Sequence, residues 1–224
     1  MIIQIKSIQN YYHREWCVYN KTDKLICKAV LNFDDEKHWV IVNFSNGLSI
    51  KMLYDEKYNK KHFSKKVKGF WNKMREKSSY RLFINESYVG FSNISSKKIN
   101  DKVGYSANEL VFYDNKLTCY DVALGKEGRY SVIYKNDSEV VATIDKNLKI
   151  IDHEDSYIVY LDNPDYYYAS VLQTIYWDIT EFVNISAISK SLSYSFVYDP
   201  REAQRNKYDP GFIQRVKALD GIVD

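Results

Sequence analysis

Basic side chains concentrate in one short stretch, residues 57–77, "KYNKKHFSKKVKGFWNKMREK". Nine lysines and arginines stand there against one acidic residue, Glu76, whereas the whole chain of 224 residues has a formal net charge of only +3. The apolar residues of this stretch recur at the spacing of one helical face: Phe63, Val67, Phe70, Trp71 and Met74. The pattern predicts a short basic amphipathic helix whose cations can attract an anionic partner.

An anionic lipid surface is one partner that this chemistry fits. Each basic residue held near an anionic membrane contributes about 1 kcal/mol, and apolar rings add to that. The candidate residues for such a surface are Lys60, Lys61, Lys65, Lys66, Lys68, Trp71, Lys73 and Arg75. The simpler interpretation is a helix on the side of the fold whose lysines are only solvated. Nucleic acid or an acidic protein is a less favoured partner, and the nearly balanced overall charge does not by itself imply nucleic acid.

Cysteine and histidine spacing predicts no metal site and no catalytic nucleophile. The three cysteines, Cys17, Cys27 and Cys119, form no CxxC pair, so we expect them to be reduced and structural. Cys119 lies in a strand candidate, where a thiol behaves as a small hydrophobic group. The four histidines also lack paired spacing. The sequence therefore predicts no catalytic residue, no metal and no cofactor.

Acidic residues give two further candidates, which we interpret as structural. In "DHEDS", residues 152–156, carboxylates that alternate along a strand would point to opposite faces and would not converge on a cation. We interpret this stretch as a polar turn. Asp178 stands alone in an apolar helix, where an unpaired charge would be costly. We expect it to mark the helix end or to accept hydrogen bonds from the backbone and tyrosine hydroxyls.

The elements that would position these residues are mostly strands. Three stretches, residues 16–30, 80–94 and 130–145, each pair two apolar runs around a polar turn that contains asparagine, which is typical of a β-hairpin. Residues 38–53, 108–124 and 147–162 add further strand candidates, with Asn46-Gly47 as the strongest turn signal. The total of roughly ten to twelve strands favours a sandwich or a barrel.

One helix near the C-terminal end decides between those folds. The stretch "NPDYYYASVLQTIYWDITEF", residues 163–182, begins with a cap and Pro164 and is apolar around most of its circumference. A helix of this kind must be buried, yet it is too short and too polar to span a bilayer. In a strand-rich chain the sheet can bury it only by wrapping around it. The sequence thus predicts a mainly β fold, a closed antiparallel barrel around a central helix.

The arrangement of residues 130–182 resembles the tubby C-terminal-like superfamily. The resemblance rests on the strand Ser156–Leu161, the turn Asp162–Asp165 and the helix that ends near Trp177-Asp178, and it covers residues 80–195. Bacterial members are similar to the plant LURP-one-related proteins and, more distantly, to phospholipid scramblases. The resemblance implies a barrel of roughly twelve strands filled by a helix. Eukaryotic tubby domains bind phosphoinositide headgroups through a basic pocket, but none of their lipid-binding residues maps onto this chain.

These observations predict one barrel domain, residues 1–197, and a charged extension, residues 198–224. After the helix, residues 183–199 suggest one or two final strands, and Asp209-Pro210 could begin a short helix through Leu219. No secretory signal or membrane-spanning run is evident, so we expect a cytoplasmic protein that can associate with the membrane periphery. We expect a non-enzymatic binding or scaffold module for an anionic surface. The alternative is a regulatory or immunity-type module that binds a protein through the C-terminal extension.

Overall fold

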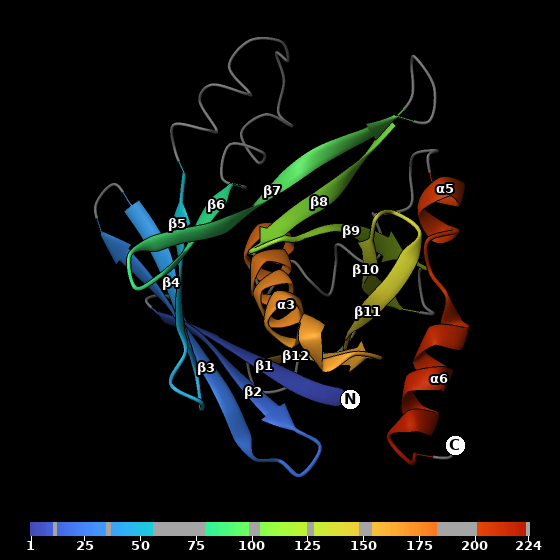
Figure 1. Cartoon of the computed structure of the whole chain (residues 1–224), viewed down its shortest axis with the longest axis horizontal. Coiled ribbons are helices and arrows are strands. Elements are labelled where there is room, and N and C mark those ends of the chain that lie inside the picture. Colours follow the sequence, from blue (N-terminus) through green and yellow to red (C-terminus); the bar gives the residue numbers. More distant parts are fainter. Residues whose placement is uncertain are drawn as a thin grey trace.

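Twelve antiparallel strands form a closed barrel in the computed structural model (Figure 1). The structure describes residues 1–10, 13–34, 37–55, 79–98, 104–124, 128–147, 154–182 and 201–222. The strands are β1 (Ile2–Asn10), β2 (His13–Asn20), β3 (Leu25–Asp34), β4 (Lys37–Phe44), β5 (Ser49–Tyr54), β6 (Tyr80–Ile84), β7 (Ser87–Lys98), β8 (Gly104–Phe112), β9 (Asn115–Ala123), β10 (Arg129–Lys135), β11 (Glu139–Lys146) and β12 (Glu154–Leu161). The predicted mainly β, closed barrel of about twelve strands is confirmed.

Each strand pairs with the next along the chain, and β1 pairs with β12 to close the barrel. In that last pair Ile3 lies opposite Val159 and Ile5 opposite Tyr157. Closure leaves none of these twelve strands with an unpaired edge. The hairpin turn predicted at Asn46-Gly47 joins β4 to β5, and Gly47 adopts the positive φ that this turn requires, 89°.

The first strand was not predicted from the sequence, although it completes the ring. The strands predicted after Phe182, in residues 183–199, lie outside the described residues, and the barrel closes without them because β1 takes the place beside β12. The predicted helix at 57–77 also lies outside the described residues, together with all eight of its candidate surface-binding side chains.

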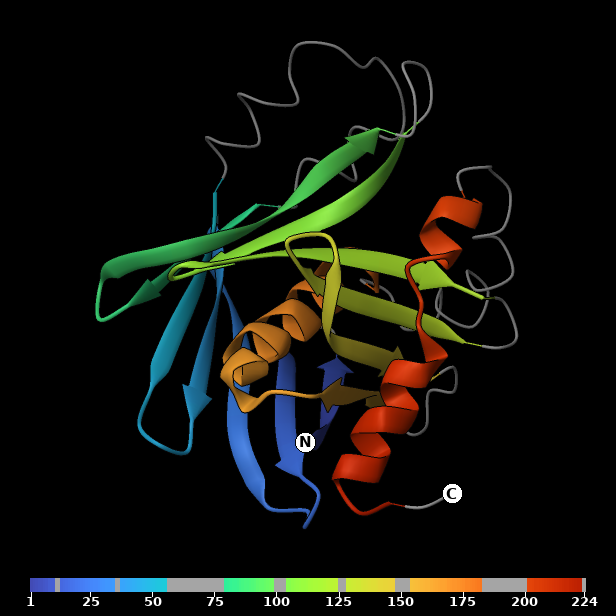
Figure 2. The ribbon, with the colours of Figure 1, turned by 45° about the vertical axis from the view of Figure 1, so that its right-hand side comes forward.

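The central helix occupies the inside of the barrel, as predicted (Figure 2). It comprises a short 3₁₀ turn, η2 (Pro164–Tyr166), followed by α3 (Tyr167–Glu181). The Asn163 side chain accepts a hydrogen bond from the Asp165 backbone N–H, which caps the start. Every residue from Ala169 to Asp178 is buried. This helix supplies the apolar core that the inward residues of the strands require.

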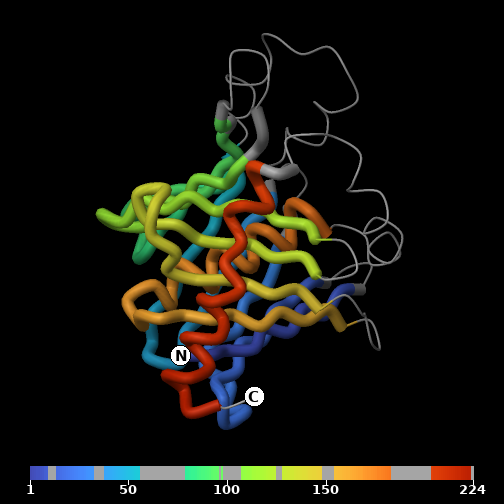
Figure 3. The backbone as a smooth tube through the Cα atoms, turned by 90° about the vertical axis from the view of Figure 1, so that its right-hand side faces the viewer, coloured from blue at the N-terminus to red at the C-terminus, as the bar shows by residue number. Residues whose placement is uncertain are grey.

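Two further helices, α5 (Arg201–Arg205) and α6 (Pro210–Leu219), follow and lie outside the barrel. The C-terminal chain crosses the outer side of the last strands (Figure 3). The predicted helix from Asp209-Pro210 through Leu219 is confirmed. Asp209 caps it by accepting a hydrogen bond from the Gly211 backbone N–H at 2.9 Å.

Candidate functional site

Charged side chains meet inside the barrel at the C-terminal end of α3. We call this group the buried ionic cluster, and its members are Arg14, Asp121, Arg129, Lys146, Asp155, Tyr157, Asp178 and Glu181. They come from α3 and from five strands, β2, β9, β10, β11 and β12. Closure of the barrel brings them together, because β2 and β12 both neighbour β1.

Asp178 is the centre of this cluster and has no solvent exposure. Its carboxylate accepts hydrogen bonds from Ser7 Oγ at 2.8 Å, from Trp16 Nε1 at 2.6 Å and from the Tyr157 hydroxyl. Arg14 completes the set with an ion pair of 2.7 Å. The structural role predicted for Asp178 is confirmed. The sequence did not reveal Arg14, which lies 164 residues away along the chain.

Tyr157 acts as a neutral donor to this carboxylate. Burial, with the negative charges of Asp178 and Asp155 adding to it, raises the pKa of Tyr157 well above its ordinary value. Arg14 also donates to the backbone oxygens of Asp178 and Phe182, both at 3.0 Å. The Asp178 carbonyl also accepts the Phe182 backbone N–H at 3.1 Å, and Phe182 is the residue that ends the helix. The cluster therefore attaches the last turn of α3 to the barrel wall.

The neighbouring charges are paired in the same manner. Lys146 is buried against Asp155, and its ammonium lies 4.6 Å from the Phe182 ring centre. Burial lowers the pKa of Lys146 and raises that of Asp155, while the attraction between the two charges opposes both shifts. Arg129 Nη2 bonds to Asp121 and lies 3.1 Å from Glu181. Each of these groups already has a partner, so the arrangement supports anchoring of the helix.

A different surface lies on the outside of β4–β7, and we call it the aromatic–basic face. Strand register places Trp39, Leu53, Arg81 and Phe91 in one row and Ile41, Lys51, Phe83 and Tyr88 in the next. Their inward neighbours, such as Val40 and Met52, are fully buried. Because side chains alternate along a strand, the two rows face outward. Tyr88 is 56% exposed.

Cations on this face lie over its aromatic rings. The Lys51 ammonium is 5.6 Å from the Trp39 ring centre, and the Arg81 guanidinium is 5.8 Å from that of Phe83. Arg81 also pairs with Asp55 at 3.0 Å. Lys51 has no carboxylate partner within the part of the chain that the structure describes. A surface hollow of about 280 Å³ lies beside it, lined by Ser49, Lys51, Leu53, Phe83, Asn85 and Glu86.

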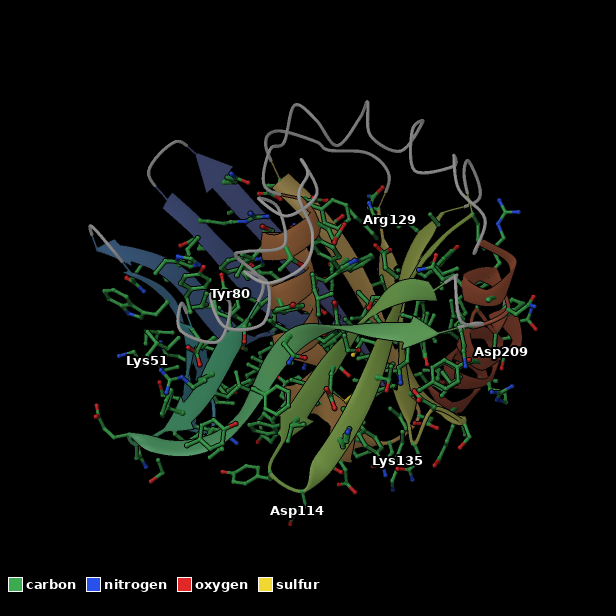
Figure 4. The ribbon with its side chains drawn as sticks, turned by 90° about the horizontal axis from the view of Figure 1, so that it is seen from above. Lys51, Tyr80, Asp114, Arg129, Lys135 and Asp209 are labelled. Atoms are coloured by element: carbon green, nitrogen blue, oxygen red, sulfur yellow. The ribbon has the colours of Figure 1, made fainter. Side chains whose placement is uncertain are left out.

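Figure 4 shows Lys51 on one outer side of the barrel and Asp209, at the start of α6, on the other. The two outer faces of the barrel thus differ. One is covered by the chain's own C-terminal helices, whereas no described helix packs on the aromatic–basic face. The strands that carry Lys51 and Phe83 are also the two strands that the basic segment 57–77 connects, β5 and β6.

A second hollow, of about 240 Å³, lies at the β10–β11 turn. Its charges are already satisfied, since Lys97 pairs with Asp137 at 2.6 Å and Lys116 with Glu109 at 2.7 Å. Although partial burial opposes the shift, hydrogen bonds from Lys97, Thr118 and Tyr120 lower the pKa of Asp137 to about 2. This hollow is a weaker candidate, because its polar groups stabilise the turn.

The remaining sequence candidates have structural surroundings. Cys119 is buried, and burial raises the pKa of its thiol, which disfavours the reactive thiolate. The His38 ring is stacked on Tyr54 and lies 2.7 Å from the Tyr80 hydroxyl.

In "DHEDS", Glu154 pairs with Lys6 and Asp155 with Lys146, so these two carboxylates point to opposite faces. The predicted polar turn is wrong for residues 154–156, because they begin β12, and residues 152–153 lie outside the described residues. The part of the chain that the structure describes contains no group of three metal-ligating side chains.

Comparison with protein-family models, with curated proteins and with solved structures finds no match for this chain. The resemblance to the tubby C-terminal-like superfamily therefore stays a prediction. Within the described ranges, no helix combines the length and the apolar character that crossing a membrane requires.

Proposed function

We propose that this protein is a non-enzymatic binding module that attaches to anionic membrane surfaces through the aromatic–basic face. The observation that carries the proposal is the strand register, which sets Trp39, Phe83 and Tyr88 beside Lys51 and Arg81 on a face that no described helix covers. Tryptophan and tyrosine favour the boundary between lipid and water, and basic residues are attracted to anionic headgroups. The basic segment 57–77 continues from the same two strands and would add to that attraction.

Co-sedimentation with vesicles tests this role. We expect the protein to bind vesicles that contain an anionic phospholipid, to bind neutral vesicles weakly, and to dissociate as salt is raised. Changing Lys60, Lys61, Lys65 and Lys66 together to Gln should remove about 4 kcal/mol of binding free energy, at about 1 kcal/mol per lysine. Absence of binding to anionic vesicles at low salt would refute the proposal.

Single substitutions distinguish the contribution of the aromatic–basic face to vesicle binding from that of the basic segment 57–77. Lys51→Gln should weaken vesicle binding about fivefold, since one unpaired cation is lost. Lys116→Gln is the matched control, because it removes the same charge from an exposed lysine that is paired with Glu109. Equal effects of the two substitutions would show that only net charge matters and would exclude a specific face.

A protein partner of the C-terminal extension is the second candidate. Leu219 is 74% exposed and Ile222 43% exposed at the outer end of α6. Deleting the extension would give an ambiguous binding result, because the deletion would also expose Tyr130 and Tyr160 on the barrel. Leu219→Ser is the sharper test: it should abolish a complex with such a partner and leave vesicle binding unchanged.

A further inference from the structure

The chain after α5 lies on an outer face of the barrel that is rich in tyrosine. The face is built from outward residues of β9–β12, and we call it the tyrosine face: Tyr120, Val122, Tyr130, Val132, Tyr134 and Tyr160. All six are buried although they point away from the barrel core. Residues 207–216 of the same chain cover them, and in Figure 3 this segment crosses the strands in red.

Two consecutive residues of the segment make specific contacts with this face. The Tyr208 ring stacks on Tyr130, with ring centres 4.2 Å apart and an interplanar angle of 29°. The Lys207 ammonium lies 4.7 Å from the Tyr120 ring centre and 5.0 Å from that of Tyr134. The Tyr134 hydroxyl donates a hydrogen bond to the Lys207 carbonyl at 2.8 Å. A cation, a ring and a backbone oxygen are thus each recognised.

The following residues add a short helix with one apolar side. Asp209 caps α6, and Pro210 occupies its first turn. Phe212 and Val216 are buried against Tyr160. An amphipathic helix that places apolar anchors in a receiving surface is a common mode of peptide recognition. All the recognised groups fall within the ten residues 207–216.

The barrel does not need this segment for closure or for its core. The twelve strands pair with one another in a ring, and α3 together with Phe182 fills the interior, so the core is complete before residue 183. Eighteen residues, 183–200, separate Phe182 from α5. A chain of that length can reach at most about 60 Å, so covalent connection alone does not require the segment to occupy its own barrel.

Two polar groups of the covered surface gain no partner from the segment. Thr143 is fully buried, and its hydroxyl makes no hydrogen bond within the described residues. Asp145 lies on the same outward side of β11 and has no ion pair in the described part of the chain. Burial raises its pKa to about 6. Both groups lower the net stability of the docked state, so release of the segment from its own barrel costs less free energy.

We propose that the tyrosine face is a binding site for a helix that starts with Tyr-Asp-Pro, and that the C-terminal segment of a second copy of the chain can occupy it. The chain's own residues 207–216 are then a built-in ligand that competes with the incoming one. This inference does not depend on the membrane role proposed above, because it uses the opposite side of the barrel.

A labelled peptide tests the proposal with the full chain. The peptide has the sequence of residues 203–222, and the receiving protein carries Tyr208→Ala and Phe212→Ala in its own segment. Weakening the internal competitor should raise peptide affinity at least about tenfold over the wild-type chain, with one peptide bound per chain. The same peptide with both substitutions is the control and should not bind. Adding Tyr130→Ala to the receiving protein should abolish binding.

Failure of the weakened variant to bind the peptide, while its unfolding stays cooperative, would overturn the proposal. Sedimentation of the wild-type chain provides a measurement that needs no variant. We expect a dimer whose fraction rises with protein concentration and falls when unlabelled peptide is added. A monomer at every concentration that also takes up no peptide would equally refute exchange.

Discussion

At the residue scale, Asp178 has the largest predicted effect on stability. Asp178→Asn keeps the size of the side chain but leaves the Arg14 guanidinium, which is 7% exposed, without its counter-charge inside the barrel. Removing one partner of a buried pair costs about 3–5 kcal/mol, and urea unfolding should measure that loss. Asp165→Asn, an exposed acid on the same helical segment, should change stability by less than about 0.5 kcal/mol. Similar losses for both variants would contradict the anchoring role of the cluster.

Asp145 gives a prediction that depends on pH. Its folded-state pKa is about 6, against 3.8 for an unperturbed carboxyl, so the folded state binds the proton more tightly. The acid contributes stability below pH 4, and this contribution is lost as pH rises through 6. Asp145 lies opposite Tyr130 on β10 and Ile158 on β12, and Tyr208 approaches it from the C-terminal segment. At pH 7.5, Asp145→Asn should raise the free energy of unfolding by about 1 kcal/mol relative to wild type, a value discounted for partial exposure. At pH 4 the substitution should leave the free energy of unfolding unchanged. Equal increases at the two pH values, measured by urea unfolding, would contradict the raised pKa of Asp145.

At the element scale, the approach of β7 to β8 depends on Gly90. A Cβ atom added there would lie 1.9 Å from the Val111 carbonyl oxygen, and the φ of 153° is strained for other residues. Gly90→Ala should therefore cost at least about 2 kcal/mol in urea unfolding, because one of the two strands must move. Gly47→Ala is the control, since open space surrounds that position and only its positive φ is unfavourable. A smaller loss at Gly90 than at Gly47 would contradict the close approach.

Local patterns were enough to predict the elements, whereas contacts between them were not. The hairpin at 130–145 and the cap at Asn163 are signalled by neighbouring residues, and the apolar circumference of α3 required a surrounding sheet. The pair Arg14–Asp178 and the row Trp39–Leu53–Arg81 depend on strand register and barrel closure. Hairpin patterns encode which consecutive strands pair, but no local pattern encodes the pairing of strands far apart in the sequence, such as β1 with β12. The strand β1 was missed although its alternation of Ile3 and Ile5 is a regular local signal, whereas its place beside β12 follows only from barrel closure.

At the scale of the whole molecule, the barrel and the helix α6 on its outside are stabilised by different contacts. The twelve strands and α3 share one core, so opening any of them exposes the others. The helix α6 packs on the outside through Phe212 and Val216 and contributes no strand to the ring. Segments with few buried contacts can open locally at a free energy well below that of global unfolding.

Hydrogen exchange under native conditions therefore distinguishes these units. The amides of α3, such as that of Ile175, should exchange only through global unfolding, so their protection should fall steeply with added denaturant. The amides of α6, such as that of Val216, should exchange faster and with a smaller dependence on denaturant than those of α3, because release of the segment exposes less surface than global unfolding. Phe212→Ala should accelerate exchange in α6 and leave α3 unchanged. Identical denaturant dependence in α3 and α6 would mean that the segment leaves the barrel only when the whole molecule unfolds, and a second copy could then not replace it in the native state.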